Sequence, residues 1–309
     1  MRLCRLTTWL CTVAAGAPAL AAAAALAGCG ATSSASTNGV SVVAAENFWG
    51  SIANQIAGNR ASVQSIITNP AQDPHDYEPT ANDARMLATS QLAIVNGAGY
   101  DPWAQKLLAA NPDSRRVVLN VGSRFGLHDG DNPHRWYSPA NVDSMAHYIT
   151  ADLSKLDPKN ADYYARRLAS FETRTLEPYH RLIAQIKRRY GGTPVGASES
   201  IFAPLAPALG LDLITPDSFM KAISEGSEVS AQDTIATQNQ IARHQVKVWI
   251  YNSQNATPQI QRLTALARAN HIPVVTITET LTPATASFEQ WQVAQLDRIE
   301  RALHEATGR

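Results

Sequence analysis

Two histidines follow prolines in polar segments of the first half of the chain. His75 lies in the segment DPHDYEPT, and His134 lies in the segment NPHRWYSP. A proline restricts the backbone around it, so both segments favour rigid loops. An imidazole nitrogen held by such a loop is a common protein ligand for a divalent transition metal. One Pro-His pair can arise by chance, but two of them direct attention to metal chemistry.

Two glutamates occupy comparable places in the second half of the chain. Glu199 directly follows an apolar run at residues 194–198, and Glu279 comes after a similar run at residues 273–277. Either glutamate alone is better explained as a solvated loop residue or a helix cap. Two imidazoles and two carboxylates that face one cleft would instead make a divalent-metal site. We therefore take these four residues together as candidate metal ligands.

The elements that must position the four candidates form an alternating pattern. Short β-branched runs alternate with helical stretches in two series, which predicts an α/β fold of two Rossmann-like lobes with mostly parallel sheets. The predicted strands span residues 40–44, 63–67, 92–96, 116–121, 194–198, 211–214, 246–251 and 273–277. Ligands of open α/β sheets bind beyond the carboxyl ends of strands. We therefore expect the metal site at the interface between the lobes.

A long helical segment separates the two series. Residues 160–190 contain no glycine and repeat apolar side chains at helical spacing. We expect one rigid connecting helix over residues 159–191, which Pro178 bends or divides. It would join an N-terminal lobe at residues 40–158 to a C-terminal lobe at residues 192–309. Such a connector permits modest rocking of the lobes but no wide hinge motion.

The N-terminal residues 1–28 are typical of a secretory signal. A basic start precedes an uncharged apolar run that ends in LAGC. This tetrad resembles the bacterial lipobox, in which cleavage precedes lipid attachment to the cysteine. We expect a lipid-anchored protein at the outer face of the cell membrane, acylated at Cys29 and held by a flexible tether at residues 29–39. The alternative is an uncleaved transmembrane anchor, because the run is nearly long enough to span a bilayer.

The composition excludes several classes of function. The 26 basic and 26 acidic residues balance, so a nucleic-acid partner is not expected. Three cysteines, two of them within the signal, cannot build a disulfide framework. The sequence contains no Walker A motif, so ATP hydrolysis would require another chain. It also contains neither HExxH nor GxSxG, two common hydrolase motifs.

The two histidine segments, NGAGYDPW between them and later stretches resemble the metal-binding solute receptors of bacterial ABC importers. This family comprises zinc, manganese and iron receptor lipoproteins, also called the zinc/manganese-binding cluster A-I proteins. The resemblance implies that His75 and His134 are the first two ligands. It implies that Glu199 is the third and that Glu279 stands where the family usually has Asp. Asn252 and Gln254 occupy a stretch in which the family often has Glu.

The resemblance implies a receptor and not an enzyme. The receptor would capture Mn²⁺ or Zn²⁺, with Fe²⁺ as a third candidate, as cargo between its lobes. It would deliver this ion, as a monomer, to an ABC permease with a separate ATPase. Carboxylate ligands favour Mn²⁺ in our expectation, with Zn²⁺ close behind. Asp73, Asp76 and Glu78 are weaker candidates for side chains that orient His75.

Two other classes of function stay open at this point. A secreted metallohydrolase would need an open coordination position and a base, such as Glu199 or Glu279, that acts on metal-bound water. An adhesin with a structural metal would resist removal of that metal by mild chelation. Permease and ATPase genes beside this one would favour transport over both.

Overall fold

A computed structural model describes residues 39–72 and 74–309. The predicted signal sequence, Cys29 and nearly all of the predicted tether lie outside these residues, as does Asp73. Among the helices that are described, none is both long enough and apolar enough to cross a bilayer.

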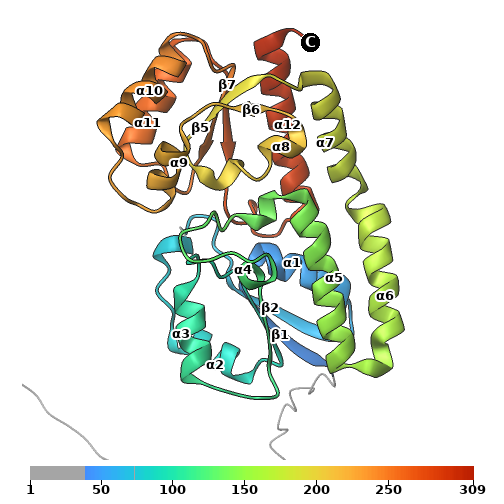
Figure 1. The fold of residues 1–309 in the computed structure, drawn as a ribbon. Helices are drawn as coiled ribbons and strands as arrows, with labels where there is room; N and C mark the ends of the chain where they lie inside the picture. The colour runs from blue at the N-terminus through green and yellow to red at the C-terminus, as the bar shows by residue number, and fades with distance from the viewer. Residues whose placement is uncertain (1–38, 73) are drawn as a thin grey trace, which may run out of the picture. The chain divides into compact units, whose positions relative to one another are not determined.

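Two separate four-stranded sheets, each entirely parallel, form the centres of two lobes (Figure 1). Their strand orders are β2-β1-β3-β4 and β6-β5-β7-β8, so the two lobes repeat one topology. The strands are β1 (Val40–Glu46), β2 (Ala61–Ile67), β3 (Leu92–Val95), β4 (Val117–Asn120), β5 (Pro194–Ala197), β6 (Asp212–Leu213), β7 (Val248–Asn252) and β8 (Val274–Ile277). The eight predicted strands are therefore confirmed, as is the α/β fold class.

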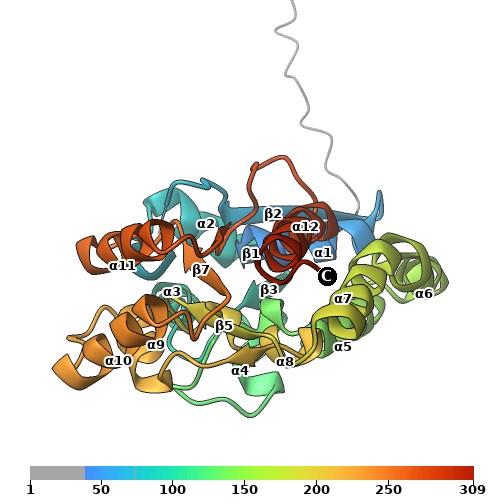
Figure 2. The ribbon, with the colours of Figure 1, turned by 90° about the horizontal axis from the view of Figure 1, so that it is seen from above.

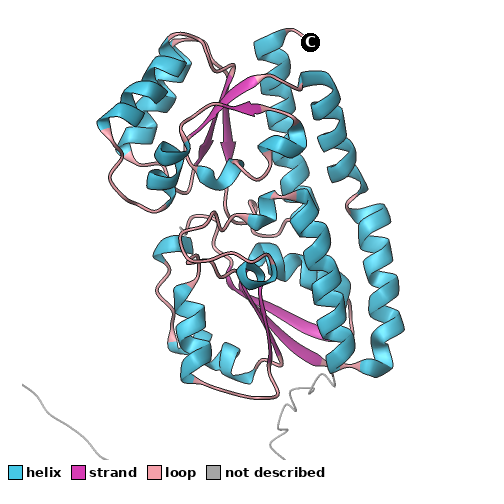
Figure 3. Ribbon diagram, in the orientation of Figure 1, coloured by secondary structure: helices cyan, strands magenta, loops and turns pink. Residues whose placement is uncertain are grey.

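Helices surround the strands of each lobe (Figure 3). In the first lobe they are α1 (Asn47–Ala57), α2 (Ala81–Thr89), α3 (Pro102–Ala110), α4 (Val121–Arg124) and α5 (Pro139–Leu156). In the second lobe they are α8 (Ala206–Leu209), α9 (Asp217–Ser224), α10 (Ala231–Ala242), α11 (Pro258–Ala269) and α12 (Phe288–Thr307). Because helices cover both faces of a parallel sheet, its central strands are continuously apolar. The strand β3, with the sequence LAIV, is buried at all of its positions.

The connector between the lobes is divided. The helix α6 (Ala161–Ser170) continues into a π-helical turn at Phe171–Thr175, and α7 (Glu177–Tyr190) begins after it. Pro178 lies in the first turn of α7, where a missing N–H costs no intrahelical hydrogen bond. The expected division at Pro178 is therefore confirmed, and the single long helix is replaced by two helices and a π turn.

A second helix crosses the boundary between the lobes beside the connector. The helix α12 packs against α7 (Figure 2) and also against β8 of the second lobe. Its N-terminal end is bound to α1 of the first lobe. Phe288 N donates a hydrogen bond to Ser51 Oγ at 2.9 Å, and Gln55 Nε2 donates to Glu289 Oε2 at 2.9 Å. Two helical elements therefore connect the lobes.

An aromatic stack in the first lobe supports the segment that carries His134. The Phe48 ring of α1 lies 4.0 Å from the Trp136 ring, with 17° between their planes. Both side chains are completely buried. Trp136 in turn contacts the His134 ring edge to face, with 5.1 Å between the ring centroids.

Phe48→Ala should destabilise the protein by about 3–5 kcal/mol, because it removes a buried aromatic ring and leaves a cavity. Denaturant unfolding monitored by circular dichroism would measure this change. Val118→Ala is the control, since Val118 is 45% exposed, and it should change the free energy of unfolding by less than about 0.5 kcal/mol. Equal effects of the two substitutions would contradict the role of the stack.

Candidate metal centre

Both candidate histidines lie in segments that lead into single turns of 3-10 helix. His75 belongs to the turn Pro74–Asp76 after β2, and His134 precedes the turn Arg135–Tyr137. The segment after His75 is held by Asp83 of α2, whose Oδ2 accepts hydrogen bonds from Tyr77 Oη at 2.8 Å and Thr80 N at 2.7 Å. The backbone around His75 is thus held on both sides, by a proline and by a helix cap.

Three of the four candidate ligands converge at one place. One potential ligand atom from each of His75, His134 and Glu279 lies within 4.8 Å of the others. The distance from His75 Nε2 to Glu279 Oε2 is 3.7 Å. His134 and Glu279 are completely buried, whereas the His75 side chain is 24% exposed. Two nitrogen atoms and one oxygen atom at these separations can hold a divalent cation.

The fourth candidate, Glu199, lies outside this group of three but is joined to it by one side chain. Glu199 follows β5 and is 1% exposed. The Asn252 side chain donates a hydrogen bond to Glu199 and another to Glu279. The Asn252 side chain thus links Glu199 to Glu279, which belongs to the group of three.

His134 is held in the form that binds a metal. Its ring Nδ1 lies 2.8 Å from Asn132 Oδ1, and Asn132 Nδ2 donates to Ser200 O at 2.7 Å. This orientation of the amide makes Nδ1 the donor and leaves the Nε2 lone pair for another partner. Among the described residues, no hydrogen-bond partner faces this buried Nε2. Burial, and then the charges of His75 and Arg135, lower the pKa of His134 well below its ordinary value, so it is neutral at neutral pH.

Tyr100 is a site residue that the sequence reasoning did not identify. It lies in the segment NGAGYDPW, which follows β3, and is 1% exposed. Its hydroxyl donates to Glu279 Oε2 at 2.6 Å, and its ring lies 4.7 Å from the His75 ring in an edge-to-face contact. Tyr100 thus contacts one candidate ligand of each lobe. Only its position after a strand hinted at this role.

A buried pair of acids supports the loop that carries Tyr100. Glu46, at the end of β1, and Asp101 are both fully buried, and their carboxyl groups interact electrostatically. Asp101 Oδ2 accepts from Asn96 N and Asp101 Oδ1 accepts from Gly97 N, both at 2.7 Å. Burial raises the pKa of Asp101 as well, but these backbone donors oppose the rise, so Glu46 is the member of the pair that keeps its proton to higher pH. Burial, and then the charge of Asp101, raise the pKa of Glu46 well above its ordinary value.

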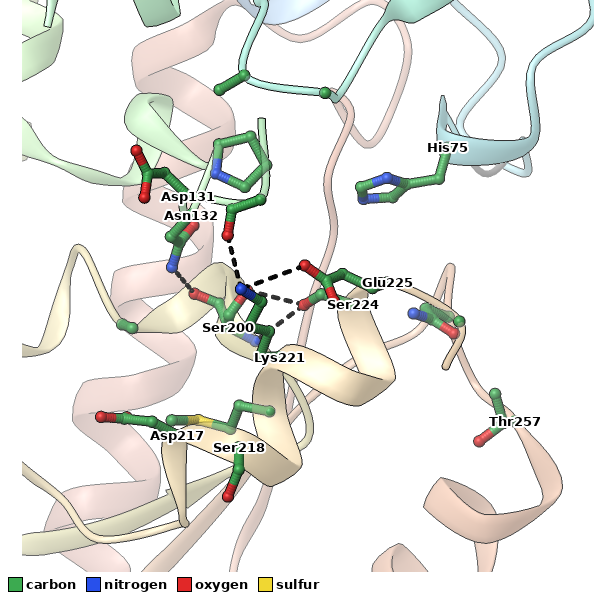
Figure 4. Close-up of a pocket in the computed structure, with 18 residues that line it drawn as sticks. His75, Asp131, Asn132, Ser200, Asp217, Ser218, Lys221, Ser224, Glu225 and Thr257 are labelled. Carbon is green, nitrogen blue, oxygen red and sulfur yellow. Dashed lines mark hydrogen bonds and ion pairs between the residues drawn. The ribbon is translucent and has the colours of Figure 1, made fainter. Parts of the chain in front are cut away.

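A cavity of about 840 Å³ adjoins His75 and is lined by both lobes (Figure 4). Two hydrogen bonds join the lobes at its wall. Lys221 Nζ of α9 donates to Gly130 O at 2.8 Å, and Asn132 Nδ2 donates to Ser200 O. The partly exposed His75 thus borders a space that is large enough for solvent and a hydrated ion.

Comparison with known proteins shows the family of the chain. A family model described as zinc-uptake complex component A, periplasmic, matches residues 42–302. The chain belongs to this family.

The curated relatives of this zinc-uptake family member are metal-binding proteins by name. The manganese-binding lipoprotein MntA of Halalkalibacterium halodurans is 27% identical over 197 residues, which cover 61% of this chain and 65% of that protein. The iron-binding protein YfeA of Yersinia pestis is 31% identical over 170 residues, or 52% of this chain and 53% of that protein. The matches thus span between about half and two-thirds of these relatives.

Solved structures of other proteins share the fold. The Mn-bound periplasmic metal binding protein of Candidatus Liberibacter asiaticus has a TM-score of 0.68 at 19% identity, over 85% of this chain and 99% of that one. A mutant of the laminin-binding adhesin Lmb of Streptococcus agalactiae has a TM-score of 0.67 at 20% identity, over 86% of this chain and 100% of that one. At these identities the likeness shows the two-lobed α/β fold.

No described contact joins His75 to the three acidic residues that are weaker candidates for orienting it. Asp73 and the side chain of Asp76 lie outside the described part of the chain, and Glu78 is exposed. The described contacts of His75 instead include the Tyr100 ring and Glu279.

Glu46→Gln should become more stable relative to the wild type as pH rises. Unfolded Glu46 ionises near its ordinary pKa of about 4.3, whereas folded Glu46 keeps its proton to higher pH. The folded state thus binds more protons in this range, and wild-type stability falls with rising pH by up to about 1.4 kcal/mol per unit until the folded pKa is passed. The variant retains a donor for Asp101 and removes this loss.

Urea unfolding of the metal-free proteins between about pH 5 and pH 8 would measure the difference. Glu78→Gln, which changes an exposed glutamate, is the control and should follow the wild type. A constant difference between Glu46→Gln and the wild type across this range would show that Glu46 does not hold the proton.

Proposed function

We propose that this protein is an extracytoplasmic, lipid-anchored receptor that captures a divalent transition metal between its lobes and delivers it to the permease of an ABC importer. The observation that carries this proposal is the buried convergence of His75, His134 and Glu279, whose potential ligand atoms lie within 4.8 Å of one another. In the described part of the chain no hydrogen-bond partner faces Nε2 of the neutral His134, which supports a ligand other than a protein hydrogen-bond donor.

The ligand set consists of two imidazoles from the first lobe and the carboxylates of Glu199 and Glu279 from the second. Two carboxylates offset the charge of a divalent ion, and the mixed set suits Mn²⁺, Fe²⁺ and Zn²⁺. The names of MntA and YfeA support manganese and iron in relatives, and the family name supports zinc. Membership of this family also supports a receptor over a metallohydrolase.

Lipid attachment at Cys29 would keep the receptor beside its permease. The LAGC tetrad supports this anchor, as does the word lipoprotein in the name of MntA. A separate ATPase would supply the energy of transport, because the sequence has no Walker A motif. The receptor needs no catalytic step of its own and acts as a monomer.

The double variant His75→Ala, Glu199→Ala should lose at least about 100-fold in affinity for Zn²⁺ and for Mn²⁺, because it removes one ligand from each lobe (about 2.7 kcal/mol). Isothermal titration calorimetry of the metal-free protein with each ion would measure this loss. His128→Ala is the control, since that side chain is 90% exposed. Unchanged affinity of the double variant would refute the site. Metal uptake by a deletion strain that carries each variant tests delivery.

A further inference from the structure

The two carboxylates of the proposed site share the amide group of one residue. Asn252 is completely buried, and its Nδ2 lies 2.6 Å from Glu199 Oε1 and 2.8 Å from Glu279 Oε1. A primary amide nitrogen carries two hydrogens. Asn252 therefore gives one hydrogen to each carboxylate and has no further side-chain N–H to donate.

The strand order of the second sheet explains this position. Asn252 is the last residue of β7, which lies between β5 and β8 in the sheet. Glu199 comes after β5, and Glu279 comes after β8. The residue at the end of the central strand is thus flanked by the two glutamates that follow its neighbours. An amide at this place can reach both carboxylates.

The orientation of the amide is fixed by its other contacts. Asn252 Oδ1 accepts a hydrogen bond from Gln254 N at 3.0 Å, and Asn252 N donates to Ser198 Oγ at 3.1 Å. A reversed amide would direct its oxygen at two carboxylates and its nitrogen at a backbone N–H. Such an arrangement would break three favourable contacts, so only the observed orientation is compatible with the site.

Neutral donors hold the remaining two carboxylate oxygens. Asn255 Nδ2 donates to Glu199 Oε2 at 2.8 Å, and Tyr100 Oη donates to Glu279 Oε2 at 2.6 Å. All four oxygens thus accept hydrogen bonds from uncharged groups. Such donors restrain the rotation of both carboxylates without cancelling their charge, which a lysine at the same place would do.

We propose that Asn252 determines metal specificity by restricting each carboxylate to one oxygen toward the ion. This inference rests on the proposed function of the site. Glu279 shows the division of roles, because Oε1 is bound to Asn252 while Oε2 faces His75 Nε2 at 3.7 Å. Each oxygen keeps a second lone pair, but chelation through both would require the carboxylate to turn within its hydrogen bonds to Asn252 and Tyr100.

This restriction favours a low coordination number. Two imidazole nitrogens and one oxygen from each of two carboxylates make four protein ligands, the usual number for Zn²⁺. Mn²⁺ is suited to octahedral, oxygen-rich coordination and would have to keep water, for which the cavity beside His75 has space. Asn252 therefore shifts the preference toward Zn²⁺, in the opposite direction from our expectation based on ligand types alone.

Asn252→Leu tests this proposal, since it keeps a similar volume and removes both hydrogen-bond donors. Co²⁺ is the probe, because its visible absorption is intense in four-coordinate sites and weak in six-coordinate ones. We expect an intense spectrum from the wild type and a weaker one from Asn252→Leu. Competition between Zn²⁺ and Mn²⁺ should show the zinc preference of the variant reduced by about tenfold or more.

Two further variants serve as controls. Gln240→Leu removes an amide of the same lobe that donates to Ile214 O, and it should leave the spectrum and the preference unchanged. Asn255→Leu removes a donor to Glu199 and to Ile223 O but none to Glu279, and it should have a smaller effect than Asn252→Leu. Equal effects of Gln240→Leu and Asn252→Leu would assign the change to general loss of packing and overturn the proposal.

The outcomes separate this inference from the proposed function. A six-coordinate Co²⁺ spectrum of the wild type would overturn the role of Asn252 even if the Leu variant did not fold. So would an unchanged spectrum and an unchanged zinc preference in Asn252→Leu, and in both cases a receptor that binds metal through His75 and Glu199 would stand. Failure of the wild type to bind any of the three ions would reject the proposed function, and the inference with it.

Discussion

Two carboxylates buried side by side repel each other and lose their hydration, and much of this structure depends on how that cost is met. The protein meets it in two ways. Burial raises the pKa of both Glu46 and Asp101, which opposes their joint ionisation, and backbone N–H groups stabilise Asp101. Glu199 and Glu279 are instead bridged by an uncharged amide. The charge of the first pair is thus reduced within the fold. The second pair keeps a negative charge that a cation could neutralise.

The repeated topology of the lobes brings these groups together. In the first sheet, Tyr100 follows β3, the neighbour of β4, after which the chain leads to His134. In the second sheet, Asn252 ends β7, which lies between the strands that precede the two glutamates. The candidate metal ligands and the side chains that contact them thus follow the carboxyl ends of strands. This is the edge of a sheet at which α/β proteins bind small molecules and ions. The supporting residues are as much a product of strand order as the candidate ligands.

The sequence predicted the strands and four candidate ligands, of which His75, His134 and Glu279 converge. The strands could be predicted because they follow from local patterns. Apolar runs mark strands, and a polar residue after such a run lies at a strand end. The role of Asn252 could not be predicted in this way, since no local pattern shows that β7 lies between β5 and β8. Gln254 illustrates the same limit. Its Oε1 accepts from Glu279 N at 2.6 Å and its Nε2 donates to Gln72 O of the other lobe at 2.9 Å, partners that are distant in sequence.

The paired helices α7 and α12 have a mechanical consequence for the cargo. The helix α12 contacts both lobes and is bonded to α1 at its first turn, and His180 Nε2 of α7 lies 3.1 Å from Asp143 Oδ1 of α5. Two helices packed side by side resist bending more than a single helix does, but they still permit small shear displacements. We expect the lobes to shear slightly without separating. An ion bound between them would then leave only as fast as its individual ligand bonds break.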